Sequence, residues 1–269
     1  MARLQDMQTV TPTSSDKLLV VQSQGQGLVP YGSKLDSANP TGSGTLAMNK
    51  KADTTLGTNS VTVGYQGTAS GNYAMAEGYR TTASGNYSHS FGESTTADGN
   101  YAIAEGADSK ASGNFAHAHG WNTRATRRSQ MVFGECNIEE TGSTTSKGTY
   151  IELVGNGTAD NARSNARTLD WSGNEVLAGT LTQSSDAKLK DIIAEELPDV
   201  SSIKAVKFKW KENSNRDSSE HIGYIAQEVE KVLPYLVKED AEGNKVLDYI
   251  AFLVAKVDSL EKRLSELEK

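Results

Sequence analysis

The strongest pattern along the chain is a period of 14 residues that begins at Leu56. The run Ala-Ser-Gly-Asn-Tyr-Ala-Met-Ala-Glu-Gly at 69–78 returns in related form at 83–92, 97–106 and 111–120. Within each copy small residues alternate with larger ones, which is typical of a β-strand. A repeat this regular predicts a solenoid in which each copy forms one coil.

The alternation also predicts which side chains lie inside each coil. Ala74 and Ala76 alternate with Tyr73, Met75 and Glu77. We expect the alanines to fill a narrow interior, and the larger residues to face outward or toward partner chains. Glycine recurs every seventh position from 57 to 120, so we expect two short strands per coil, each closed by a glycine turn. Such a thin β-roll buries little by itself, so it needs lateral partners.

The first coils carry a further motif, Asn-Ser-Val-Thr-Val-Gly at 59–64. This motif and the coils after it resemble the head repeats of trimeric autotransporter adhesins over about residues 55–136. The resemblance implies that three rolls pack side by side. The alternative is an unrelated glycine-rich segment, but such low-complexity segments rarely keep a strict register.

Two segments with other patterns flank the β-roll, which we place at 57–136. Residues 1–56 are polar with one β-like run at 18–22, which predicts extended structure with a short strand. The resemblance described below for the C-terminal segment implies that 1–56 is an attachment segment, with a flexible leader as the alternative. Residues 137–184 contain β-like runs separated by Gly-Asn turns, which we interpret as an interlocked trimeric β-stalk. These runs cover 149–154, 167–171 and 175–182.

The composition changes abruptly at Ser185. Of the 27 basic and 34 acidic residues in the chain, 32 lie in the segment 185–269. Alternation over 200–211 predicts a strand, and 222–233 predicts a short helix that ends at Pro234. We therefore assign 185–269 to a separate α+β domain.

The end of this domain has apolar residues at spacings of three and four. This pattern is a heptad stripe and predicts a short coiled coil, with an amphipathic helix packed on its own domain as the alternative. The stripe consists of Ile250, Leu253, Val257, Leu260, Leu264 and Leu267.

Ser185 and Lys190 could form a hydrolytic pair at the composition change. A desolvated lysine loses its proton near neutral pH and can activate a serine hydroxyl. An offset of five residues lies on opposite faces of a strand and about 140° apart on a helix, so a turn or a neighbouring chain must bring them together. The alternative is a serine or aspartate helix cap followed by solvated lysines.

The run Ser-Asp-Ala-Lys-Leu-Lys-Asp-Ile-Ile at 185–193 resembles the opening of the self-cleaving intramolecular chaperone domains that end phage tail fibres and endosialidase-type tailspikes. The runs His-Ile-Gly-Tyr-Ile-Ala-Gln-Glu-Val at 221–229, Leu-Pro at 233–234 and Asp-Tyr at 248–249 follow in the family order. The resemblance implies a trimer-forming folding aid. It also implies cleavage between Ser184 and Ser185 by a dyad of Ser185 and Lys190, with no cofactor.

Composition narrows the possible partners. A net charge of −7 and a pI near 5.2 argue against a nucleic-acid-binding surface. A single cysteine, Cys136, excludes an intrachain disulfide and fits assembly in a reducing cytoplasm as a buried thiol. We expect neither a signal peptide nor membrane insertion, because the start lacks the signal pattern and long apolar runs are missing.

The pair His117 and His119 suggests a metal site. Alternation puts both imidazoles on the same side of a strand, and most equivalents of His117 in other coils are apolar, as expected at a trimer axis. Three chains would supply six imidazoles in an octahedral cage suited to iron, which resembles His-x-His sites in trimeric phage fibres. Equivalents of His119 include Glu77 and Glu105, which weakens this hypothesis. Surface or stacked histidines are the alternative.

Together these patterns predict a mostly β homotrimeric phage or prophage tail fibre that attaches to the host cell. It would be made in the bacterial cytoplasm and located in the virion tail, bound to other tail proteins through its N-terminus and to a bacterial surface receptor, with a glycan as one option. Its only enzymatic activity would be serine self-cleavage, without turnover of an external substrate. The alternatives are a bacterial trimeric adhesin, which needs a signal peptide and membrane barrel, and a glycan-degrading tailspike, which needs a cleft with paired carboxylates.

Overall fold

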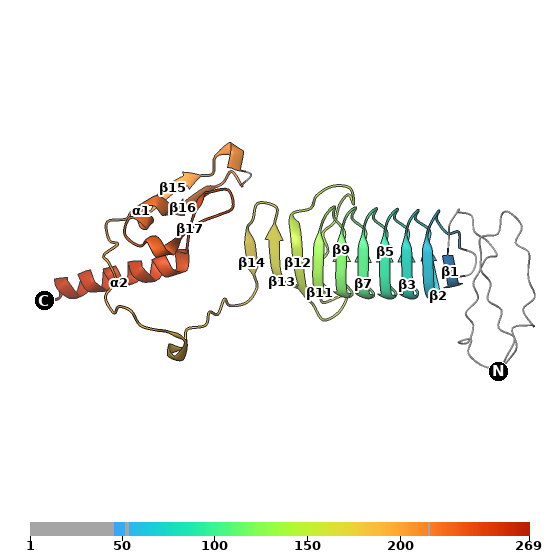
Figure 1. Cartoon of the computed structure of the whole chain (residues 1–269), viewed down its shortest axis with the longest axis horizontal. Helices are drawn as coiled ribbons and strands as arrows, with labels where there is room; N and C mark the ends of the chain where they lie inside the picture. The colour runs from blue at the N-terminus through green and yellow to red at the C-terminus, as the bar shows by residue number, and fades with distance from the viewer. Residues whose placement is uncertain (1–45, 52–53, 215) are drawn as a thin grey trace, which may run out of the picture.

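The computed structural model describes residues 46–51, 54–214 and 216–269 (Figure 1). The strand expected at 18–22 lies outside these residues. A row of stacked strands leads into an antiparallel meander. An extended segment then connects the meander to a small α/β unit that ends in the longest helix of the described chain.

The stacked strands form a β-solenoid with a 14-residue repeat, which confirms the predicted coil. Strands β2, β3, β5, β7, β9 and β11 are parallel, and β1 (Leu46–Lys50) extends their sheet beside β2. Met75 pairs with His89, His89 with Ile103, and Ile103 with His117, each 14 residues further on. The strands of this face are β2 (Val61–Ala69), β3 (Met75–Tyr79), β5 (His89–Glu93), β7 (Ile103–Ala107), β9 (His117–Trp121) and β11 (Met131–Glu135).

A second, narrower face closes each coil. It consists of the two-residue strands β4 (Thr82–Ala83), β6 (Thr96–Ala97), β8 (Lys110–Ala111) and β10 (Arg124–Ala125), which stack in parallel on the end of β2. The interior between the two faces is built from small side chains, as predicted. Ala74, Ala76 and Ala104 are buried, whereas the Tyr73 side chain points outward and is 52% exposed.

The prediction that every seventh glycine forms a turn holds for only one of the two glycines in each coil. Gly71 and its equivalents lie where each coil turns, but Gly78 and its equivalents lie inside strands. A Cβ atom at Gly78 would come within 2.0 Å of the carbonyl oxygen of Gly92 on the next coil. This second row of glycines is therefore required by the close approach of neighbouring coils. Residues with side chains, such as Tyr87 and Asp108, take the left-handed φ at the corners instead.

Two ladders run along one corner of the solenoid. The aromatic rings of Tyr73, Tyr87, Tyr101 and Phe115 stack with centroids 4.9 Å apart, close to the spacing between strands. Beside them, the backbone N–H of each asparagine donates to the side-chain oxygen of the next, as from Asn72 to Asn86 at 3.0 Å. These contacts between identical positions hold the coils in register.

After the solenoid, β12 (Tyr150–Asn156) pairs in parallel with β11 and antiparallel with β13 (Asn165–Asp170). Strand β14 (Glu175–Leu177) completes this meander beside β13. The third predicted β-run, 175–182, is too long. Its strand ends at Leu177, because β14 has a pairing partner only over those three residues.

The C-terminal unit contains two antiparallel strand pairs and two helices. Strand β15 (Val206–Lys209) pairs with β16 (Glu220–Gly223), and β17 (Val237–Glu239) pairs with β18 (Lys245–Leu247). Short 3₁₀ turns lie at Glu212–Ser214 (η3) and Pro234–Leu236 (η4). The predicted helix 222–233 is shorter in the structure, where α1 covers Ala226–Glu230, because Ile222 is paired within the sheet.

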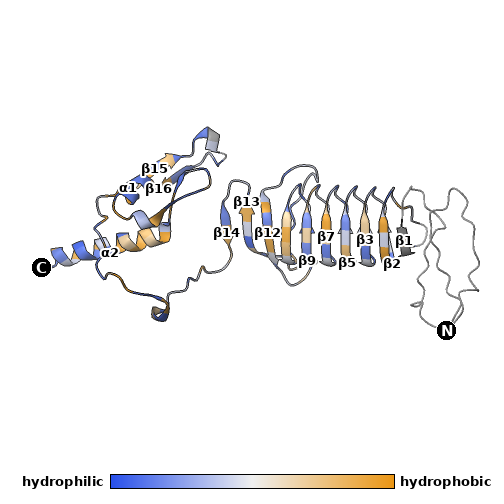
Figure 2. Ribbon diagram, viewed as in Figure 1, coloured by the Kyte–Doolittle hydropathy of each residue, from blue (hydrophilic) through white to orange (hydrophobic). Residues whose placement is uncertain are grey.

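Helix α2 (Tyr249–Leu267) has two apolar faces. Phe252 and Ala255 are buried against Val229 and Leu233 of the same unit. The predicted heptad stripe, from Ile250 to Leu267, is 47–83% exposed. The helix therefore packs on its own domain through a face that the stripe did not predict, and the coiled coil stays a prediction. Figure 2 shows hydrophobic residues in the first half of α2 and mainly hydrophilic ones in its last turns.

None of the helices in the described part of the chain is both long enough and apolar enough to span a bilayer.

Candidate functional site

The predicted pair Ser185 and Lys190 flanks the 3₁₀ turn η2 (Ala187–Leu189) in the extended segment before the C-terminal unit. The Asp186 carboxylate caps this turn by accepting from the backbone N–H of Lys188 at 2.9 Å. The turn folds the chain back so that Lys190 Nζ donates a hydrogen bond to Ser185 Oγ at 2.5 Å. A local turn therefore joins two side chains that neither a helix nor a strand would bring together.

Within a single chain the Ser185–Lys190 pair is exposed to solvent. Ser185 and Lys190 are both exposed, as are the apolar side chains of Leu189, Ile192 and Ile193, the last at 97%. A lysine acts as a general base when burial disfavours its charged form. Within one chain the described residues provide the hydrogen bond between the two side chains, but not that burial.

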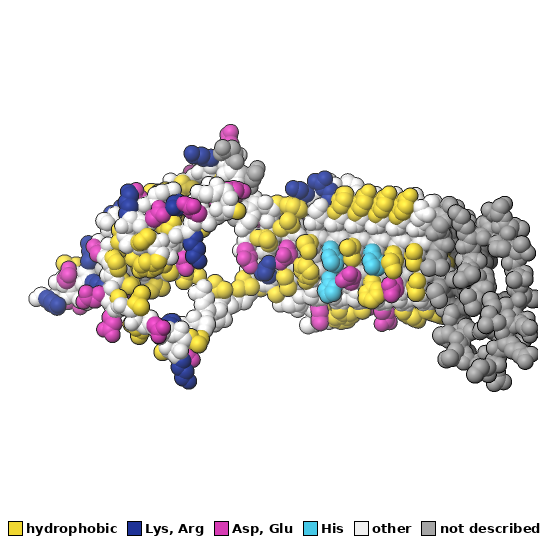
Figure 3. Space-filling model, viewed as in Figure 1, with side chains coloured by type: hydrophobic (Ala, Val, Ile, Leu, Met, Phe, Trp, Pro, Cys, Tyr) yellow, Lys and Arg dark blue, Asp and Glu magenta, His cyan; other side chains and the backbone are white. Residues whose placement is uncertain are grey.

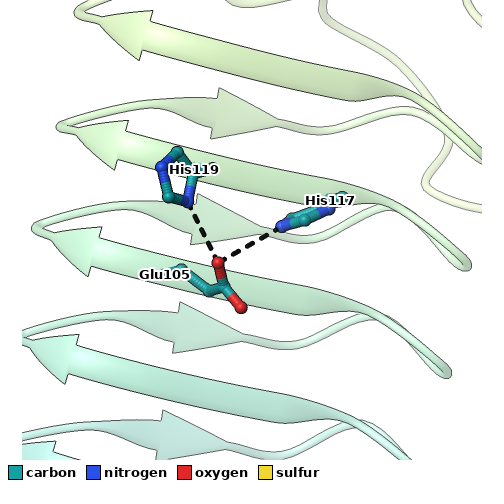
Figure 4. Close-up of side chains that lie close together, drawn as sticks. All are labelled: Glu105, His117 and His119. Atoms are coloured by element: carbon teal, nitrogen blue, oxygen red, sulfur yellow. Dashed lines mark hydrogen bonds and ion pairs between the residues drawn. The ribbon is translucent and has the colours of Figure 1, made fainter.

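A second cluster joins three residues of neighbouring strands (Figure 4). His117 and His119 lie on β9, with both side chains turned toward Glu105 on β7. Nδ1 of His119 is 3.0 Å from Oε2 of Glu105, and Nε2 of His117 is 3.7 Å from the same oxygen. One potential ligand atom from each residue lies within 4.8 Å of the others. The two histidines thus share one side of the strand, as predicted.

The pKa of Glu105 is shifted within this cluster. The hydrogen bond from His119 and the nearby histidine charges lower the pKa of Glu105, although partial burial opposes them. Glu105 is not among the site residues that the sequence predicts. Its signal in the sequence is the 14-residue offset to His119, because register neighbours on adjacent coils lie side by side.

The histidines continue an outward-facing row that is mainly apolar. Val61, Met75, His89, Ile103 and His117 follow one another on successive strands. Figure 3 shows histidines among hydrophobic and acidic side chains along this face of the solenoid. Nε2 of His89 and Nε2 of His117 are shielded from solvent and make no hydrogen bond to the described residues. Such atoms need a hydrogen-bond partner, which a water molecule, an ion, a ligand or a partner chain can supply.

Comparison with known proteins gives two matches. Residues 185–238 match the family Peptidase_S74, described as chaperone of endosialidase. The Long tail fiber protein Gp37 of Salmonella phage S16 is 35% identical over an alignment of 119 residues, which covers 39% of this chain and 16% of that protein. The matched part thus spans well under two thirds of the relative. No solved structure matches the chain. The resemblance to the chaperone family is confirmed for residues 185–238, which begin where the composition changes. For residues 239–269 it stays a prediction.

Proposed function

We propose that the chain is a structural tail-fibre protein of a phage or prophage that acts as a homotrimer in the virion tail and attaches to a host cell. Its segment 185–269 acts as an intramolecular chaperone and is released by cleavage between Ser184 and Ser185. The match of 185–238 to the endosialidase chaperone family carries this proposal. The similarity to a long tail fibre protein and the solenoid, a shape suited to a fibre shaft, support it.

Cleavage uses groups that the turn η2 already gathers. Ser185 Oγ attacks the carbonyl carbon of Ser184 while Lys190 Nζ, in its neutral form, takes the hydroxyl proton. The C–N bond breaks, the proton passes to the released amine of Ser185, and the 1–184 segment is left as an ester on Ser185 Oγ. Water then hydrolyses this ester. The backbone N–H of Asp186 is our candidate for stabilising the oxyanion.

Three chains supply what one chain lacks. Leu189, Ile192 and Ile193 surround the cleavage segment with uncovered apolar surface, and the α2 stripe adds more. Packing these surfaces against their copies buries apolar area and desolvates Lys190, so self-cleavage starts only after the chains have assembled. The β-roll 57–136 and the β-stalk 137–184 remain in the mature fibre, and 1–56 binds the virion.

Mass spectrometry of the purified native protein tests this proposal. We expect two polypeptides, 1–184 and 185–269, and a native mass equal to three copies of the first. An intact chain of 269 residues in a monomer would contradict the proposed function.

We further propose that the mature trimer holds a structural metal ion at its histidines, with iron as the expected metal. His117 and His119 from three chains supply six imidazoles on the threefold axis. Glu105 accepts from Nδ1 of His119, which fits the usual role of a carboxylate that orients a metal-binding histidine.

Elemental analysis of the trimer tests the metal and its ligands. We expect about one transition-metal ion per three chains, lost in a His117→Ala variant and retained at reduced affinity in Glu105→Gln. A ratio of one ion per chain, lost in Glu105→Gln, would instead assign the site to Glu105, His117 and His119 of a single chain. Metal-free protein from metal-replete medium removes the proposal.

A further inference from the structure

A hollow of about 530 Å³ lies on the side of the solenoid. Its floor and walls come from the coils around β6, β8 and β10, and from the loop between β12 and β13. The charged and aromatic residues that line it are Asp108, Lys110, Trp121, Arg124 and Asp160. None of them belongs to the cleavage segment or to the histidine cluster.

Trp121 gives the hollow an accessible aromatic surface. It belongs to the row that starts with Tyr65 and Tyr79, whose rings stack on each other at 5.4 Å. On the coil before Trp121 the equivalent residue is Ala107. A methyl group cannot cover an indole, so the side chain of Trp121 stays 42% exposed beside the hollow.

The loop that carries Asp160 is held against the coils by polar contacts. Asp160 accepts from Nδ2 of Asn122 at 2.9 Å and pairs with Arg163, and Nη1 of Arg163 donates to the carbonyl oxygen of Asn122 at 3.0 Å. Asn122 is buried, and the guanidinium of Arg124 lies 3.7 Å from Asp160. The loop is thus fixed to the solenoid, and the hollow is formed before any ligand binds.

Two charged groups at the rim remain available to a ligand. The Asp108 carboxylate makes no hydrogen bond or ion pair within the described part of the chain, and its residue is exposed. Lys110 pairs with Asp98 at 3.1 Å but its side chain stays 45% exposed, so its ammonium keeps free donors. The other cation, Arg124, is engaged by Asp160 and by the carbonyl oxygen of Asp108.

We propose that this hollow binds a neutral pyranose of a bacterial surface polysaccharide. This inference rests on the host-attachment role proposed above. An aromatic face attracts the weakly positive C–H groups of a sugar ring, while the carboxylate of Asp108 and the ammonium of Lys110 accept from and donate to its hydroxyls. An acidic ligand fits less well, since both cations of the hollow already have carboxylate partners.

Saturation-transfer NMR on the mature trimer tests the proposal with free hexoses, deoxyhexoses and N-acetylhexosamines as probes. We expect transfer to the ring C–H protons of at least one pyranose, and about tenfold or greater weakening in Trp121→Ala. Tyr79→Ala is the matched control, because Tyr79 lies in the same row with a similar exposed fraction of 40% but outside the hollow. It should bind as wild type does.

A second variant separates binding from folding. Asp108 has φ +53°, a conformation that asparagine adopts readily, so Asp108→Asn should fold normally and still weaken the sugar signal. The absence of transfer to every probe, or equal binding by Trp121→Ala and wild type, would overturn the inference. If such a protein is nevertheless a cleaved trimer that binds bacterial cells, the fibre function stands. If the trimer binds no cells, the attachment role itself is wrong.

Discussion

A chain with Ser185→Ala should accumulate as one uncut polypeptide of 269 residues under conditions in which wild type separates into 1–184 and 185–269. The variant lacks the hydroxyl to which Lys190 Nζ donates a hydrogen bond, so no ester can form. Removing a nucleophile from an enzyme typically slows its reaction by about 10⁴-fold or more. Gel electrophoresis with intact-mass measurement over several days would detect the remaining cleavage.

The role of Lys190 can be separated from its charge. Lys190→Arg keeps a cation beside Ser185, but a guanidinium does not release its proton in proteins, so cleavage should stop as in Lys190→Ala. Lys188→Ala is the control: Lys188 belongs to the same exposed turn, and only its backbone contacts Asp186. It should be cut normally. Normal cleavage of Lys190→Arg would show that the positive charge suffices, and the general-base mechanism would be wrong.

The coils were predictable because their physical cause is local. Alternation and the 14-residue period place Ala76 and Ala104 inside and Tyr73 outside, as observed. The role of Gly78 is not predictable from the local sequence. Glycine is needed there because a side chain would clash with the backbone of the next coil, in addition to the constraint from its own φ. Helix α1 was overestimated because the pairing of Ile222 with Lys207 is a tertiary contact.

The candidate sites also differ in whether local sequence or a tertiary contact determines them. A five-residue spacing indicates that a turn or a neighbouring chain must join Ser185 and Lys190, and within one chain the turn η2 brings the two side chains together. Glu105 could have been found from the register, since it is one repeat before His119. The hollow beside Trp121 could not, because its wall comes from Asp160, which lies in an irregular loop with no repeat to place it.

A stop codon after Ser184 should reduce the yield of soluble trimers by at least about tenfold, even though every residue of the mature fibre is still made. The solenoid interior consists largely of alanine, serine and threonine, so each coil buries little apolar area, and contacts in the proposed trimer would add to its stability. In the proposed trimer the three chains must also pack against one another in register, and a trimerising domain would raise their local concentration. Size-exclusion chromatography with light scattering measures the outcome.

Substitutions in the exposed stripe of α2 test whether this face of the helix, and not the whole domain, drives assembly. Leu253→Glu with Leu260→Glu changes residues that are 48% and 58% exposed, whereas Phe252 and Ala255 still hold the helix on its own domain. We expect this double variant to keep the helical circular dichroism of fragment 185–269 but to prevent trimers and cleavage in the full chain. Glu266→Gln, outside the stripe on the same helix, should assemble as wild type does. Wild-type trimer yield from either the truncated gene or the double variant would show that 185–269 does not drive assembly through this face.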